Sequence, residues 1–322
     1  MTGETRQPIP WLQGYIPDIP TPFDATGEVD LAAFRRLCER QIETGATALV
    51  IGEVAGEDSV LSESEHSALT RTAVRVSRGR VAVIAGAGSN STAAAIELSR
   101  QAQADGADAV LSVVPYYNKP TQAGIYGHFC AIAEAIRLPI ILHDVPSRTA
   151  RELCDETVAN LSRWSPQFIG LKDATGDISR PQRLRPLTSP EFRLLSGDDA
   201  TAPAFLVHGG DGCISVTSNV IPELCHDLHR HCRDGELQTA RSLAIEIGRV
   251  TAALRRDPAP ASVKFALNLI GLTAPHVRLP LLELSETAKD TVAETIRAIK
   301  QKCIGHRFTA GEGSANCLNA FR

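Results

Sequence analysis

Short apolar runs alternate with amphipathic helical segments along most of this chain, and that repeat limits the fold more than any other feature. One unit is the run from Ala46 to Ile51, which follows a helical segment and enters a glycine-containing loop. Eight such units fill about 220 residues, and no tight turn such as Asn-Gly joins two strands as a hairpin. Strands separated by helices pair in parallel, and eight of them can close into a ring. The sequence therefore predicts an α/β protein built as a (β/α)8 TIM barrel.

Capping residues mark where two of the helices begin. Asp30 precedes apolar positions with helical spacing, starting at Leu31. Ser62 and Glu65 have the spacing of a capping box, in which each side chain satisfies a free backbone N–H of the first turn. We therefore expect helices that start at Leu31 and directly after Ser62.

The pattern changes after Asp234, where strands stop and only helical periodicity remains. We expect helices over Leu237 to Leu254, Ser262 to Leu269 and Ala288 to Lys302. The sequence thus predicts a barrel over 1–234 that carries the active site, followed by a C-terminal helical region over 235–305. The last stretch, 306–322, is rich in small and polar residues without a period, and we expect it to be a disordered tail.

Composition and charge indicate a small-molecule partner. A net charge of −4 and the lack of a basic run argue against nucleic acid or an anionic membrane surface. No stretch approaches the roughly 18 unbroken apolar residues that span a bilayer, and the first residues lack the apolar core of a signal peptide. The 8 cysteines have no paired short spacings, which is typical of free thiols. We expect a cytoplasmic protein.

Two patterns that could hold a cofactor or a metal are both weak. Gly86-Ala-Gly88 is similar to a dinucleotide-binding turn, but the third glycine of that motif is missing. Cys225, His229 and Cys232 share one face of a single helix, whereas a structural zinc site normally takes its ligands from two elements. The sequence therefore predicts no cofactor and no metal.

The apolar run that ends in Lys172 carries the strongest chemical signal. Read as a strand, its alternation places Phe168, Gly170 and Lys172 on one side. A lysine buried at a strand end should have a lowered pKa, and its neutral amine is then a nucleophile able to form a Schiff base. The alternative is an ordinary surface lysine just past the strand.

Other polar residues follow the remaining strands, at the barrel end where TIM-barrel enzymes do their chemistry. His143 has an imidazole suited to proton transfer, and the guanidinium of Arg148 matches a carboxylate. Each also has a structural alternative, since His143 could bond a backbone carbonyl in the core and Arg148 could pair with a surface acid. Together they favour imine chemistry on a keto acid. The further strand-end candidates are Thr21, Glu53, Tyr116, Tyr117, Asp198 and Ser215.

Five segments of the chain jointly resemble the dihydrodipicolinate synthase and N-acetylneuraminate lyase family, and in particular its synthase branch. The likeness extends from about Gly14 to Leu282. The segments are Val114-Pro-Tyr-Tyr-Asn-Lys-Pro120, Val145-Pro-Ser-Arg-Thr149, Gly170-Leu-Lys-Asp-Ala-Thr-Gly176, Ser196-Gly-Asp-Asp199 and Gly212-Cys-Ile-Ser-Val-Thr-Ser-Asn-Val220.

This resemblance implies roles for several residues. Lys172 would form the imine with pyruvate or a related 2-keto acid, and Arg148 would hold the carboxylate of the second substrate. Tyr117 would reach into the active site of a neighbouring subunit, and the backbone carbonyl of Ile214 would lie near the bound keto acid. The resemblance also implies a homotetramer or homodimer and no metal cofactor.

Two positions depart from the family pattern. Val54 and Ala55 stand where the family has paired threonines that hold the pyruvate carboxylate and relay protons, and His143 stands in place of a tyrosine. The backbone N–H groups of residues 54 and 55 can still cradle a carboxylate, but valine cannot pass a proton. His143 is therefore the expected general acid or base, and Glu53 and Glu57 are further candidates if the pocket raises their pKa values.

The sequence thus predicts a class I Schiff-base lyase or synthase that condenses pyruvate with an aldehyde through Lys172. One alternative is a dehydratase, deaminase or retro-aldolase that acts on another 2-keto acid through the same imine. The other is a non-catalytic protein that binds a 2-keto acid, which the altered proton relay would permit.

Overall fold

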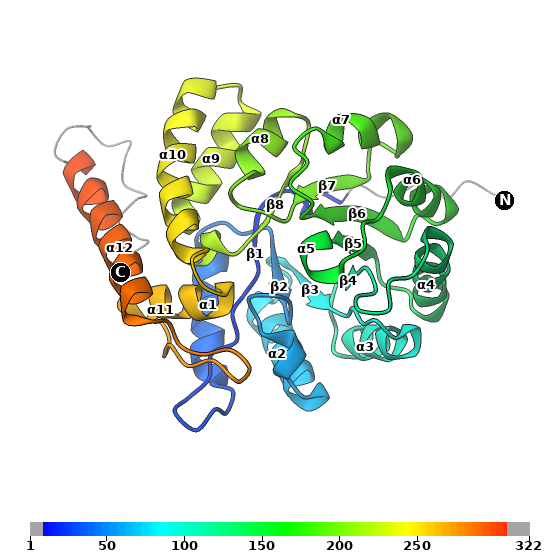
Figure 1. Cartoon of the computed structure of the whole chain (residues 1–322), viewed down its shortest axis with the longest axis horizontal. Helices are drawn as coiled ribbons and strands as arrows, with labels where there is room; N and C mark the ends of the chain where they lie inside the picture. The colour runs from blue at the N-terminus through cyan, green and yellow to red at the C-terminus, as the bar shows by residue number, and fades with distance from the viewer. Residues whose placement is uncertain (1–8, 308–322) are drawn as a thin grey trace.

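Eight parallel strands form a nearly closed barrel surrounded by helices in the computed structural model, which describes residues 9–307 (Figure 1). The strands are hydrogen-bonded in the order β1-β8-β7-β6-β5-β4-β3-β2. An isolated parallel bridge between Asp18 and Val50 joins the two ends of this sheet. The predicted (β/α)8 TIM barrel is therefore confirmed.

Each strand is short and is followed by at least one helix. The strands are β1 (Gly14–Pro17), β2 (Ala48–Ile51), β3 (Ala82–Gly86), β4 (Ala109–Val113), β5 (Ile140–Asp144), β6 (Phe168–Asp173), β7 (Arg193–Ser196) and β8 (Gly212–Ser215). The barrel helices are α1 (Leu31–Glu43), α2 (Glu63–Ser77), α3 (Thr92–Ala104), α4 (Gln122–Ala135), α5 (Pro146–Thr149), α6 (Asp155–Trp164), α7 (Arg180–Leu184), α8 (Ala202–Val207) and α9 (Pro222–Arg233).

The helix starts expected from capping residues are both confirmed. The Asp30 side chain accepts hydrogen bonds from the backbone N–H groups of Ala32 and Ala33, so α1 begins at Leu31. Ser62 and Glu65 form the complete capping box at the start of α2. Because these contacts join residues at most three positions apart, the local sequence is enough to predict them.

Side chains alternate along the strands between the barrel interior and the layer beneath the helices. One apolar cluster fills the interior with a side chain or two from every strand, among them Ile16, Val50, Ile141 and Ile214. The residues next to them in sequence point outward and pack against the helices. The polar side chains that continue the inward rows therefore meet at the C-terminal end of the barrel.

Strand β6 breaks this alternation, contrary to the expected arrangement of its side chains. Its pairing with β5 changes register, so that Ile140 lies opposite Phe168 and Ile141 lies opposite Gly170. Phe168 consequently packs under the helices, whereas Ile169 enters the barrel interior. Placing Phe168 on the same side as Lys172 was therefore wrong, because a bulge adds one residue before the inward-facing lysine.

Three helices follow the barrel: α10 (Leu237–Leu254), α11 (Ala259–Leu269) and α12 (Glu286–Arg307). Helix α10 packs against α9, and α12 packs against α10 and α11 on the same flank of the barrel (Figure 1). The three helices share an apolar cluster with the outer side of β1 and β2. The expected bounds of α10 are confirmed. The segment 306–322, expected to be disordered, lies outside the described residues except for the last two positions of α12. Among residues 9–307, no helix is long and apolar enough to cross a membrane.

Candidate active site

A cavity of about 210 Å³ opens at the C-terminal ends of the strands, and Lys172 lies in its wall. Lys172 is 4 % exposed, so the alternative of a surface lysine is wrong. Gly197 lets the chain pass close to it, because a Cβ there would lie 3.2 Å from the Lys172 Cγ atom. Several of the expected site residues meet in this wall: Val54, His143, Arg148, Lys172, Asp198 and Ile214.

Lys172 is held by Glu53, whose Oε2 atom lies 2.6 Å from the lysine Nζ atom. Burial by itself lowers the pKa of Lys172, but the negative charges of Glu53 and Asp18 outweigh it and raise that pKa above its usual value. The expected fall in the lysine pKa was therefore wrong. The free protein holds an ammonium group, which must lose a proton before it can attack a carbonyl.

Glu53 bridges Lys172 and a second functional side chain. Its Oε1 atom lies 3.1 Å from the Nδ1 atom of His143. Burial raises the pKa of Glu53, whereas Lys172 and His143 lower it. The resulting pKa is well below the usual value of a glutamate. The expected upward shift was therefore wrong, and Glu53 is a carboxylate poised between an amine and an imidazole.

His143 is fully buried at the end of β5, directly opposite Lys172 in the strand pairing. Burial and the charge of Lys172 lower its pKa, and Glu53 only partly offsets them. The imidazole is therefore neutral at neutral pH and can accept a proton. Its near neighbour is the Glu53 carboxylate.

Arg148 lies on α5, a single helical turn that directly follows β5. Its side chain is exposed and forms no ion pair with an acid among residues 9–307, which argues against a merely structural role. It lines both the Lys172 cavity and a neighbouring cavity of about 300 Å³, and the two cavities also share Val54 and His143. A guanidinium at this junction can bind an anionic group that enters from either side.

The loop after β2 departs from the expected carboxylate cradle. Val54 lines the cavity, but the backbone N–H of Ala55 donates a hydrogen bond to the Asp18 Oδ2 atom, 3.2 Å away. Thr21 ties the same loop to β1 through a hydrogen bond of 2.7 Å to the carbonyl of Gly56. The Ala55 donor is thus already occupied by a carboxylate of the protein itself.

Asp18 is the functional candidate that our reading of the sequence missed. It follows β1, is 1 % exposed and lines the Lys172 cavity. Burial raises its pKa to about 7, with Lys172 opposing that rise and Glu53 adding to it. The sequence contains one signal for this role, because Asp18 is an isolated acid between Ile16-Pro and Ile19-Pro at the end of an apolar strand.

Glu57, which we considered for proton transfer, is committed to a different contact. It forms a buried ion pair with Lys264 of α11 and accepts the backbone N–H of Arg278 at 3.1 Å. Lys264 also lies 4.0 Å from the centre of the Phe23 ring. This network fastens the loop that carries Glu53 to the C-terminal helices. Glu57 also lines the second cavity, beside Glu53 and His143, so its role in proton transfer stays a prediction.

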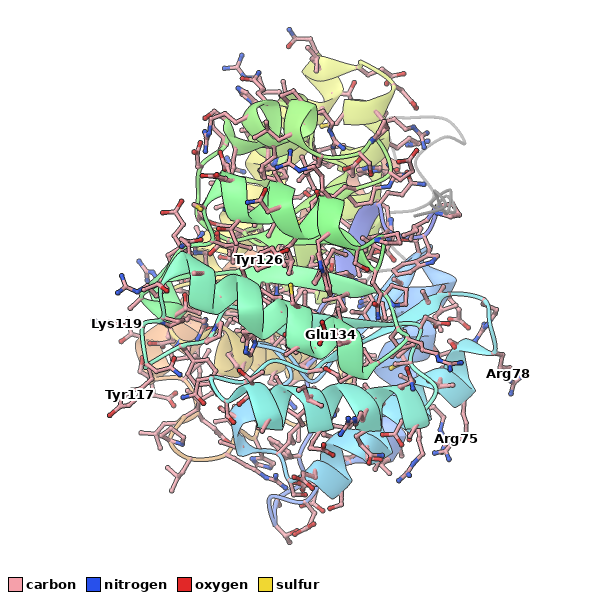
Figure 2. All side chains as sticks on the ribbon, turned by 90° about the vertical axis from the view of Figure 1, so that its right-hand side faces the viewer. Arg75, Arg78, Tyr117, Lys119, Tyr126 and Glu134 are labelled. Carbon is pink, nitrogen blue, oxygen red and sulfur yellow. The ribbon has the colours of Figure 1, made fainter. Side chains whose placement is uncertain are left out.

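Tyr117 lies apart from the Lys172 cavity of its own chain. It is 88 % exposed, has a left-handed backbone conformation with φ of 70°, and projects from the edge of the molecule in Figure 2. Its neighbour Tyr116 lines the second cavity. Within one chain, the structure therefore does not bring Tyr117 together with Lys172.

A buried arginine that we had not singled out supports both reactive strands from outside the cavity. The Arg180 Nη1 atom lies 2.7 Å from Asp144 and 3.3 Å from Asp173, the residues that directly follow His143 and Lys172. Arg180 also donates to the carbonyl of Leu153. This arginine therefore holds the ends of β5 and β6 together.

Comparisons with known proteins show the family of this chain. The model of the dihydrodipicolinate synthetase family matches residues 11–299. A 4-hydroxy-tetrahydrodipicolinate synthase of Hyphomonas neptunium is 49% identical over 287 residues, covering 88% of this chain and 96% of that protein.

Solved structures with the same fold point to the same family. The 4-hydroxy-tetrahydrodipicolinate synthase of Methylacidiphilum fumariolicum SolV has a TM-score of 0.88 and 37% identity, covering 92% of this chain and 98% of that one. The dihydrodipicolinate synthase of Acinetobacter baumannii, determined in complex with pyruvate, has a TM-score of 0.86 and 40% identity, covering 89% and 98%. The family model matches this barrel, with its buried lysine at the end of β6, along nearly the whole chain. The protein is therefore an enzyme that belongs to the dihydrodipicolinate synthetase family.

Proposed function

We propose that this protein is a class I synthase that condenses pyruvate with an aldehyde through an imine on Lys172. The observation that carries the proposal is the buried ammonium of Lys172, held 2.6 Å from Glu53 in the wall of a cavity. The family membership and the pyruvate complex of the Acinetobacter baumannii relative support pyruvate as the keto acid.

Glu53 provides a route for the first proton. Its carboxylate accepts a proton from the Lys172 ammonium, and the free amine attacks the keto carbon of pyruvate. The resulting carbinolamine loses its hydroxyl as water when Glu53 returns the proton, which leaves a protonated imine and an ionised Glu53. Because the two groups are already in hydrogen-bonding contact, the transfer needs no rearrangement.

His143 is placed for the next steps. As a neutral base it removes a proton from the methyl carbon of the pyruvyl imine, which gives an enamine. The enamine carbon attacks the aldehyde, and the imidazolium then protonates the new alkoxide. In this scheme His143 and Glu53 together replace the threonine and tyrosine that the family resemblance leads one to expect.

Arg148 is the proposed anchor for the second substrate. Its guanidinium lies where the two cavities meet and can bind the carboxylate of the aldehyde. Val54 and the backbone carbonyl of Ile214 complete the pyruvate side of the site. An aldehyde that carries an acidic group, such as the substrate of the 4-hydroxy-tetrahydrodipicolinate synthases, fits this arrangement.

A dehydratase that uses the same imine is the second candidate. The specific observation in its favour is the Glu53 and His143 pair, because two groups that exchange protons beside an enamine can expel a hydroxyl from the substrate. A panel of aldehydes with pyruvate, run beside 2-keto-3-deoxy sugar acids alone, separates the two reactions. Consumption of pyruvate only when an aldehyde is present supports the synthase.

Borohydride trapping tests the imine directly. Incubation with pyruvate and borohydride should add one reduced pyruvyl group to the peptide that contains Lys172, as measured by mass spectrometry. Absence of an adduct would exclude both enzymatic candidates and leave the alternative of a non-catalytic keto-acid binder.

We expect His143→Ala to lower kcat of the condensation by roughly 10²- to 10⁴-fold, because the proton transfers after imine formation lose their base. Borohydride trapping of pyruvate by this variant should remain close to that of the wild type, since Glu53 and Lys172 are intact. Glu53→Gln is the matched comparison, because it should slow the trapping step itself. An unchanged kcat in His143→Ala would remove the imidazole from the mechanism.

Tyr117 leads to a prediction about assembly. We propose a homotetramer or homodimer in which the exposed Tyr117 enters the site of a neighbouring subunit. Lys172→Arg and Tyr117→Ala should each be impaired alone. When the two variants are refolded together in equal amounts, about half of the subunit pairs contain one chain of each variant. One of the two sites in such a pair has both residues intact, so activity should recover to about a quarter of the wild-type level. A fully active Tyr117→Ala, or no recovery on mixing, would contradict the shared site.

A further inference from the structure

Two carboxyl groups lie close to the amine of Lys172. Asp18 and Glu53 come from the loops after β1 and β2, and the negative charge of each raises the pKa of Lys172. Asp18 is almost completely buried, its Oδ2 atom accepts one hydrogen bond from Ala55, and its Oδ1 atom has no hydrogen-bond partner. A buried oxygen without a partner beside a substrate cavity is costly, and it is the natural place for a proton.

A keto acid brings a third carboxylate into this cluster. When Lys172 forms a protonated imine, its single positive charge is kept, so no new cation arrives to balance the incoming charge. The substrate carboxylate is attached to the carbon that bonds to the Lys172 Nζ atom, so it must lie among the groups around that atom. Three carboxylates would then lie around the single charge of Lys172, whereas the Arg148 guanidinium is exposed and lies where the two cavities meet. This crowding of negative charge favours protonation of one carboxylate.

Asp18 is the carboxyl group best placed to become neutral. Glu53 is kept ionised by its contacts with Lys172 and His143. Asp199, the other acid that faces Asp18, also has its pKa raised by burial, but it accepts hydrogen bonds from the Ser215 hydroxyl and from the backbone N–H groups of Val216 and Thr217, which oppose that rise and favour its charged form. Asp18 has only the Ala55 donor, and its burial already shifts its pKa to about 7.

We propose that Asp18 is a specificity-determining residue whose carboxyl group takes up a proton when a keto acid binds. This inference rests on the proposed function and names a residue that adjusts the site to the substrate carboxylate. The neutral carboxyl can donate a hydrogen bond to that carboxylate and leaves the Ala55 N–H free to do the same.

The Lys172 ammonium and the ketone form a protonated imine and one water, with no net change in protons. The ionised Asp18 takes one proton from the solvent. Binding of one keto acid above neutral pH therefore consumes one proton, and binding of an uncharged ketone consumes none.

Isothermal titration calorimetry with pyruvate in buffers of different ionisation enthalpy measures this proton. At pH 8 we expect uptake of about one proton per pyruvate in the wild type, and at pH 5.5 almost none. Between pH 7 and 8.5 the apparent affinity for pyruvate should fall, with a slope that steepens above pH 7 toward a limit of about tenfold per pH unit. Affinity that stays flat over this range, with no proton uptake, would overturn the inference.

Asp18→Asn is the matched variant, because it mimics the neutral acid with the same shape. It should bind pyruvate with little pH dependence and no proton uptake, and Asp18→Ala provides the same test if the asparagine variant folds poorly. Hydroxyacetone, an uncharged ketone of similar size, should show no proton uptake with the wild type. Uptake that persists in both variants would place the proton elsewhere and refute the role of Asp18.

Borohydride trapping at pH 6 separates this inference from the function it rests on. A Lys172 adduct formed with pyruvate at this pH, together with pH-independent affinity, would remove only the role of Asp18. Absence of an adduct in the wild type and in Asp18→Asn would remove the imine, and the inference with it.

Discussion

Replacement of Lys172 by arginine is expected to abolish borohydride trapping of pyruvate and to lower the condensation rate by roughly 10³-fold or more. Arginine keeps a positive charge beside Glu53, which contacts Lys172 at 2.6 Å, so the local charge balance is preserved. The guanidinium cannot form the imine, and the loss therefore reports on the nucleophile rather than on the fold. Peptide mapping by mass spectrometry and steady-state rates measure the two effects.

Lys264 is the rival nucleophile in this experiment, because its lower pKa alone would favour it over Lys172. Burial lowers the pKa of Lys264 to about 8, although Glu57 opposes that shift, so a larger share of its amine is neutral. Its Nζ atom is nevertheless enclosed by Glu57 and the Phe23 ring, away from the Lys172 cavity. An adduct that persists in Lys172→Arg and maps to Lys264 would show that the nucleophile had been misidentified. Lys289 lies on α12, and Lys289→Arg is the control for the effect of a lysine-to-arginine substitution as such.

Replacement of Arg180 by methionine is expected to lower the free energy of unfolding by about 3–5 kcal/mol. Arg180 is fully buried, and its removal leaves Asp144 and Asp173 in the interior without their counter-charge. Urea unfolding followed by circular dichroism measures the change. Arg183→Met is the matched control, because Arg183 is half exposed and pairs with Asp155 and Asp177, and exposed pairs contribute only about 0–1 kcal/mol.

The destabilisation should grow as the pH rises. Burial raises the pKa of Asp144 to about 6 even though Arg180 opposes that shift, and without Arg180 the pKa should rise further. A raised pKa in the folded state means that the folded protein binds the proton more tightly, so stability is lost as pH increases. The difference between Arg180→Met and the wild type should therefore be smaller at pH 5 than at pH 8. A difference that is larger at pH 5 would mean that these carboxyl groups are not the cause.

The parts of the fold that depend on neighbouring residues could be predicted from the sequence. The capping contacts of Asp30 and Ser62 join residues at most three positions apart, and α10 has the expected bounds of Leu237 and Leu254. The β6 bulge could not be predicted, because it depends on how Phe168 and Ile169 meet the partner strand β5. Helix α5 was missed because a single turn is too short to show a period.

For the site, the sequence by itself determined which residue types stand at the C-terminal strand ends, including Lys172, His143 and Arg148. Only the tertiary structure decided their charges. The pKa of Lys172 is raised rather than lowered because Glu53 and Asp18, more than 100 residues away along the chain, lie beside it in the barrel. Electrostatic interaction depends on distance through space and on burial, and strand periodicity encodes neither for residues on different strands. The same reason explains why Asp18, an unremarked acid in the sequence, becomes a functional residue once the barrel closes.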